Sequence, residues 1–129
     1  MINLYINERR VGEVTVLDMK GRIRLGGGTI SLHKAIHCLI NEGKLRILLN
    51  LAGVTHIDSS GLGELIASCI TLNARGGEIK LLHLTQSLRE LMTITKLLTV
   101  FDVYDDEPEA LSSFAASYPS LKEPLPFVA

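Results

Sequence analysis

The sequence predicts a single α/β domain in which a mixed β-sheet of about five strands is flanked by about four helices. Its 129 residues, 47% hydrophobic and 21% charged, are typical of one globular domain with its own core. Short apolar runs with strand character alternate with longer segments of helical periodicity, in the order β-β-α-β-α-β-α-β-α. We expect the domain to occupy residues 1–117 and an irregular, proline-containing tail to occupy residues 118–129.

Two strand-like segments indicate an opening β-hairpin. Residues 2–6 alternate apolar and polar side chains, and residues 14–19 repeat the strand signal after a connection at residues 10–13 that contains Gly12. The short separation predicts that these two strands pair in an antiparallel way.

The first helix follows Gly26, Gly27 and Gly28, which we interpret as a flexible connection, with Thr29 as a plausible N-cap. Apolar residues then recur at helical spacing as far as Gly43, namely Leu32, Ala35, Ile36, Leu39 and Ile40.

Residues 45–51 form an almost continuous apolar run. Such a run is typical of a strand covered by helices on both faces, so we place it at the centre of the sheet.

A second amphipathic helix is predicted between the polar residues 58–60 and about Ala74, where Gly76 and Gly77 follow. Residues 78–84 have the pattern of the next strand. Thr85 is the expected N-cap of a third helix, which carries its apolar stripe on Leu88, Leu91 and Met92.

The last strand and helix are short. Residues 100–104 form the expected strand, and acidic residues around Pro108 predict a final helix from about Pro108 to Ala116. The tail from Tyr118 holds three of the four prolines, Pro119, Pro124 and Pro126, and is therefore expected to be irregular.

The net charge, the apolar runs and the cysteines bear on the partners and the location that we expect. The net charge of -1 favours neither nucleic acid nor an anionic membrane as an electrostatic partner. No apolar run approaches the roughly 18 residues of a membrane span, and the N-terminus lacks a signal-peptide pattern, so we expect a soluble cytoplasmic protein. Cys38 and Cys69 fall in apolar helical patterns, and we interpret both as buried free thiols.

Neither the glycines nor the histidines predict a cofactor site. Gly21 and the glycines at 26–28 match no phosphate-binding or dinucleotide-binding spacing. His33 and His37 are an i, i+4 pair on one helix face, but no acidic residue or cysteine joins them in the sequence pattern. A metal site needs three or four ligands, so we expect neither metal nor cofactor.

The polar residues 56–63 offer the strongest functional signal, because they stand where an apolar strand gives way to a helix. A helix N-terminus has unpaired N–H groups and a partial positive charge, so it accepts a capping oxygen or an anion. Asp58, Ser59 or Ser60 could therefore be a cap, a nucleophile or a phosphorylation site. From the residues alone, helix capping by one of the three is the simplest interpretation.

Enzymatic interpretations of this segment are weak. Ser59 has Ile57 where a nucleophile elbow needs glycine, and His56 has no evident orienting carboxylate, so a hydrolase is not expected. Asp58 as a phosphoacceptor would need further acidic residues to hold Mg²⁺, and the first strands supply only isolated Glu13 and Asp18. We expect that the protein is not an enzyme.

Three segments together resemble the STAS domain of anti-sigma factor antagonists. They are the strand and helix start at residues 47–63, with Asp58-Ser59-Ser60-Gly61-Leu62-Gly63, and the segments 76–81 and 98–101. The resemblance spans roughly residues 12–115 and implies a mixed sheet flanked by helices, as the element order also does. It also implies binding to an anti-sigma factor that is itself a serine kinase of the histidine-kinase-like ATPase type.

In such a family the kinase inactivates the antagonist by phosphorylating a serine, and a serine phosphatase restores it, which regulates transcription by partner switching. By position, the resemblance implies that Ser59 is the phosphorylation site, with Ser60 as the secondary candidate. It also implies a partner-binding surface around Asp58, Ser59 and Ser60 that includes Gly61 and Leu62. A monomer is expected when the protein is free.

The chain departs from its relatives at the end of the second predicted strand. Many relatives have acidic residues there, whereas this chain has Arg22 and Arg24, which we include in the expected partner-binding surface. The change suggests a different kinase partner or one with a complementary acidic patch. The alternative function is a STAS-type interaction adaptor of a signalling or transport complex without sigma-factor regulation.

Overall fold

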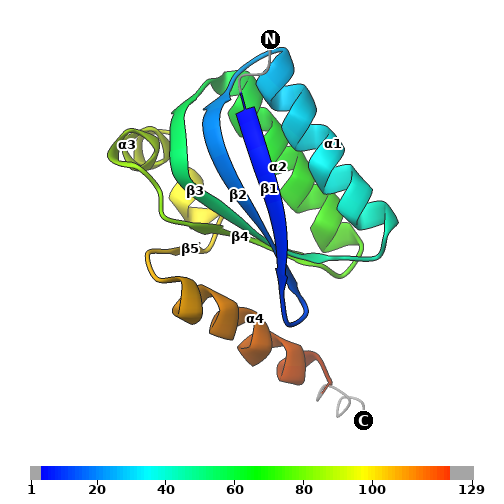
Figure 1. Ribbon diagram of the computed structural model, residues 1–129. Helices are drawn as coiled ribbons and strands as arrows, with labels where there is room; N and C mark the ends of the chain where they lie inside the picture. The colour runs from blue at the N-terminus through cyan, green and yellow to red at the C-terminus, as the bar shows by residue number, and fades with distance from the viewer. Residues whose placement is uncertain (1–3, 123–129) are drawn as a thin grey trace.

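The protein is a five-stranded mixed sheet with helices on both faces (Figure 1). The computed structural model describes the backbone of residues 4–122 and the side chains of residues 4–114. In chain order the elements are β1 (Leu4–Val11), β2 (Val14–Ile23), α1 (Gly27–Asn41), β3 (Arg46–Ile57), α2 (Ser59–Ala74), β4 (Glu78–Leu82), α3 (Gln86–Ile94), the 3₁₀ turn η1 (Leu97–Thr99), β5 (Val103–Tyr104) and α4 (Glu107–Lys122). The predicted fold class and element order are confirmed.

The strands lie in the order β1-β2-β3-β4-β5, and only β1 runs antiparallel to its neighbour. The predicted hairpin is confirmed, with Val11 opposite Val14 and a turn at Gly12, whose φ is 62°. Its first predicted residues, Ile2 and Asn3, lie outside the described residues. The predicted central strand is confirmed as β3, which pairs in parallel with β2 on one side and with β4 on the other.

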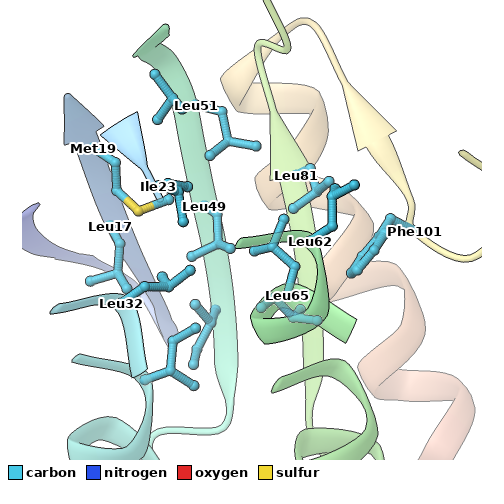
Figure 2. Close-up of a cluster of buried hydrophobic side chains, with 14 of the residues drawn as sticks. Leu17, Met19, Ile23, Leu32, Leu49, Leu51, Leu62, Leu65, Leu81 and Phe101 are labelled. Atoms are coloured by element: carbon cyan, nitrogen blue, oxygen red, sulfur yellow. The ribbon is translucent and has the colours of Figure 1, made fainter. Parts of the chain in front are cut away.

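Consecutive residues of the inner strands pack alternately into two separate hydrophobic cores, one on each face of the sheet. Leu17, Leu49 and Leu81 point to the face covered by α1 and α2 (Figure 2), and Leu32 and Leu65 of these helices join them. The opposite face forms a smaller cluster under α4, consisting of Val14, Val16, Leu48, Leu82, Ala110 and Phe114. Two covered faces explain why the central strands are apolar at almost every position.

The first helix begins earlier than predicted. Its N-cap is Gly26, at φ 95°, so Gly27 and Gly28 are helical rather than part of a flexible connection, and Thr29 is not the cap. The Thr29 hydroxyl instead donates to the carbonyl oxygen of Arg24 at 2.8 Å. A Cβ on Gly28 would collide with the carbonyl oxygen of Arg22, so this glycine lets the helix start close to β2.

The end of the domain also differs from the prediction. The last strand is only Val103–Tyr104, because η1 and the buried Phe101 precede it. The final helix runs from Glu107 to Lys122 rather than from Pro108 to Ala116, so residues 118–122 are helical and not irregular. Proline removes one hydrogen bond from a helix without always ending it. Residues 123–129 lie outside the described residues, and the domain division at residue 117 stays a prediction.

Both cysteines are free thiols as predicted, but Cys38 is exposed and Cys69 only half-buried. Their apolar helical patterns predict that both are buried, and this prediction is wrong. Cys38 lies on the exposed side of α1, where the Glu42 carboxylate is 3.7 Å from its thiol. Burial raises the pKa of the Cys69 thiol.

Within residues 4–122, no helix is both long and apolar enough to cross a membrane.

Arg9 ties the start of α4 to the opening hairpin. Its Nε lies 2.6 Å from an Asp18 oxygen, and its terminal nitrogens lie 2.7 and 2.8 Å from the two Glu107 oxygens. These hydrogen bonds hold the pKa of both carboxyl groups below their usual values, and Asn50 adds a further donor to Asp18. Depressed carboxyl pKa values stabilise the fold above the unfolded pKa, and this stabilisation is lost as the pH falls through the folded pKa.

We therefore expect the free energy of unfolding of the wild type to fall more steeply than that of Arg9→Gln between about pH 5 and pH 3. Urea titrations at several pH values measure the difference. Arg10→Gln, on the same strand but outside these ion pairs, should keep the wild-type pH profile. Parallel profiles for wild type and Arg9→Gln would contradict the role of Arg9.

Candidate functional site

The candidate site lies at the edge of the sheet where β2 and β3 end and where α1 and α2 begin. Because these two strands are parallel neighbours, Ile23 at the end of β2 stands opposite Ile57 at the end of β3. Each strand is then followed by a helix on the same face (Figure 1). The edge therefore gathers two helix N-termini, as parallel α/β connections require.

Asp58 is the N-cap of α2, although residue type alone left three candidates for that position. One carboxylate oxygen accepts a hydrogen bond from the Gly61 N–H at 2.9 Å, and the backbone is extended at φ -106°. The other oxygen accepts from the Leu25 N–H at 3.0 Å. Asp58 therefore clamps the loop before α1 to the start of α2.

The backbone N–H groups of Leu25 and Gly61 hold the pKa of Asp58 below its usual value, and the Leu25 N–H has the larger effect. A carboxylate that accepts backbone N–H groups is stabilised in its charged form. The site therefore carries a fixed negative charge one residue before Ser59.

Gly61 lets the first turn of α2 approach β2. A Cβ on this glycine would lie 2.5 Å from the Ile23 carbonyl oxygen and 2.7 Å from Cγ1 of Ile57. Ile23 itself is fully buried, and Gly28 of α1 approaches the same strand end. Two glycines thus bring both helix starts against the end of β2.

Ser59 is the first residue of α2 and is exposed, whereas Ser60 is half-buried. Of the three residues that the sequence offers as caps, Asp58 makes the capping bond. That bond does not involve the Ser59 hydroxyl. Gly61 is buried and Leu62 is 8% exposed, so these two members of the expected surface face inward.

Arg22 and Arg24 flank this edge, and both are exposed. Arg22 stands opposite His56 in the β2–β3 register, and the Arg24 backbone carbonyl accepts from Thr29. Among the ion pairs of residues 4–114, none involves either arginine. Leu25, which follows Arg24 and whose N–H donates to Asp58, is 78% exposed.

Asp58→Ala is expected to lower the melting temperature by a few degrees and to speed hydrogen exchange of the Leu25 and Gly61 amides, since both lose their acceptor. Ser59→Ala should change neither quantity. Thermal unfolding and amide exchange followed by NMR provide the measurements. An equal loss of stability in Ser59→Ala would show that the serine contributes to the cap.

The structure adds a neighbour to the histidine pair that the sequence pattern does not contain. An acidic residue does join His33 and His37, but it comes from α2: an oxygen of Glu64 lies 3.0 Å from Nδ1 of His33. The two imidazole rings stack with centroids 4.0 Å apart. The sequence pattern could not show this neighbour, because it lies on a different helix.

Leu25 and Glu64 are the two residues of interest that sequence reasoning missed. The role of Leu25 is a backbone N–H, which no side-chain pattern reveals. Glu64 could have been found from topology, because consecutive parallel crossovers place α1 and α2 side by side.

The chain is similar in sequence to relatives of known name. An anti-sigma F factor antagonist of Paenibacillus polymyxa is 30% identical over 66 residues, which are 51% of this chain and 56% of that protein. The chain thus matches little more than half the length of this relative.

Solved structures share the fold. An anti-sigma factor antagonist from Mycobacterium paratuberculosis superimposes with a TM-score of 0.76 at 20% identity, over 85% of this chain and 92% of that one. The antagonist SpoIIAA in its unphosphorylated form gives 0.66 at 22% identity, over 86% and 98% of the two chains. SpoIIAA from Bacillus in its phosphorylated form gives 0.68 at 21% identity, over 85% and 99%.

The family model with the description STAS domain matches residues 5–110, which include nearly the whole sheet and the entire edge around Asp58. The chain therefore belongs to the STAS domain family.

Proposed function

We propose that the protein is a cytoplasmic anti-sigma factor antagonist that binds an anti-sigma factor and is released when Ser59 is phosphorylated. The observation that carries the proposal is the exposed Ser59 at the first position of α2, next to a cap that Asp58 provides. The relative from Paenibacillus polymyxa bears the name of an antagonist, and SpoIIAA has a phosphorylated form. Both support the assignment.

Phosphate on Ser59 would add about -1.5 to -2 charges at the N-terminus of α2. The partial positive charge of a helix N-terminus favours an anion there, so the fold can accept the modification without unfolding. The effect of phosphorylation would therefore appear at the interface with the partner, through charge repulsion and the bulk of the phosphate oxygens.

The proposed docking surface consists of Ser59, Ser60, Leu25, Arg22 and Arg24. The exposed Leu25 side chain offers an apolar anchor, and the two arginines supply positive charge for an acidic patch on the partner. Asp58 holds this surface together through Leu25. Gly61 and Leu62, being buried, position the start of α2 instead of touching the partner.

Affinity purification from the native organism tests the proposal. The tagged Ser59→Ala protein, which cannot be released by phosphorylation, should retain a serine kinase of the histidine-kinase-like ATPase type. Mass spectrometry identifies the captured protein, and a serine phosphatase acting on the phosphorylated wild type should restore capture. Recovery of transport or signalling subunits without such a kinase would contradict the proposal and favour an adaptor.

A further inference from the structure

A cluster of three metal-ligating side chains lies between α1 and α2, away from the Asp58 cap. Both helices begin at the same edge of the sheet and run side by side (Figure 1). His33 and Glu64 each lie roughly one and a half turns from the start of their helix, and His37 follows one turn later. The parallel arrangement therefore brings Glu64 to the level of His33, with His37 one turn further along α1.

The distances fit a single ion after small side-chain rotations. One ligand atom from each of His33, His37 and Glu64 lies within 4.8 Å of the other two. The closest pair, His33 Nδ1 and Glu64 Oε2, is 3.0 Å apart. Two ligand atoms bound at about 2.1 Å to a tetrahedral Zn²⁺ are about 3.4 Å apart, so this pair already has nearly the required spacing.

The environment of Glu64 points to a cation. Its side chain is only 15% exposed, and the buried Ser68 hydroxyl donates to the same oxygen at 3.4 Å, which orients the carboxylate. Within residues 4–114, no lysine or arginine forms an ion pair with Glu64. A partly buried carboxylate of this kind is stabilised by a cation, and an oriented ligand binds a metal more tightly.

We propose that His33, His37 and Glu64 form a Zn²⁺ site that links α1 to α2. Two imidazoles and one carboxylate are ligands typical of Zn²⁺, and water completes the tetrahedron at the exposed side, where His33 is 53% exposed. The i, i+4 spacing of the two histidines places both on one helix face. This cluster does not include Ser59, and Zn²⁺ binding there does not depend on the function proposed for that serine.

Titration of the chelator-treated full chain with ZnCl₂ tests the site. Calorimetry should show one equivalent bound, and the melting temperature should rise by several degrees and return on addition of EDTA, because an ion that binds only the folded state stabilises it. His37→Gln and Glu64→Gln should each weaken binding at least about tenfold. His56→Gln and Cys38→Ser, which leave the cluster intact, should bind as the wild type does.

A second measurement covers the case in which a cluster variant does not fold. In wild-type protein, Zn²⁺ should shift the imidazole NMR signals of His33 and His37 and leave those of His56 and His83 in place. The site is overturned if no Zn²⁺ binds, if His37→Gln and Glu64→Gln bind like the wild type, or if Cys38→Ser abolishes binding.

Discussion

Replacing Ser59 by aspartate is expected to weaken binding of the cognate anti-sigma factor by up to about three orders of magnitude. A like charge about 4 Å away across the interface costs about 4 kcal/mol at an effective dielectric constant of about 20 before screening. A change of about 1.4 kcal/mol in binding free energy changes the dissociation constant tenfold. Calorimetric titration at two salt concentrations measures the loss, which should shrink at the higher concentration because salt screens exposed charges.

Two variants separate charge from size. Ser59→Asn has nearly the volume of the aspartate variant without its charge and should bind far more tightly. Ser60→Asp moves the charge to a half-buried neighbour and should have a smaller effect. Wild-type affinity in Ser59→Asp would contradict the proposed switch, and equal losses in the aspartate and asparagine variants would show that bulk alone excludes the partner.

Gly61→Ala is expected to destabilise the protein by about 1–3 kcal/mol, the usual cost of forcing an extra methyl into a closely packed site. The new Cβ would lie 2.5 Å from the Ile23 carbonyl oxygen, which is backbone and cannot rotate away. Relief requires α2 to move from the end of β2. Urea unfolding should show a lower midpoint with an unchanged slope, since the surface exposed on unfolding is the same.

Gly63 provides the matched control, because it lies near the start of the same helix and a Cβ added to it would have nothing within 4 Å. Gly63→Ala should therefore stabilise the protein by about 0.5–1 kcal/mol through helix propensity. If both alanine variants shift the urea midpoint in the same direction, the close approach at Gly61 does not constrain the fold.

The sheet can be predicted well because its apolar patterns depend on burial. The run at residues 45–51 predicts a strand between two helical layers, and β3 has that position. Its extension to Ile57 is not evident from the sequence, because β4 ends at Leu82, so beyond Asn50 only β2 pairs with β3 and the side chains become mixed. Burial there no longer imposes a clear pattern.

The sequence predicts the place of the site but not its details. The segment Asp58, Ser59 and Ser60 does begin α2, yet all three are good caps, so residue type cannot choose among them. The choice falls on Asp58 because its second oxygen also reaches the Leu25 N–H, a partner 33 residues earlier in the chain. Contacts of this kind depend on tertiary packing, as does the meeting of Glu64 with His33.

Phosphorylation of the purified protein by its cognate anti-sigma kinase with ATP, followed by mass spectrometric mapping, tests the central claim most directly. Ser59 is expected to carry a single phosphate, Ser60→Ala should be phosphorylated as the wild type is, and Ser59→Ala should remain unmodified. Phosphate incorporated into Ser59→Ala at the wild-type rate, or mapped to another residue in the wild type, would contradict the assignment of Ser59 as the switch.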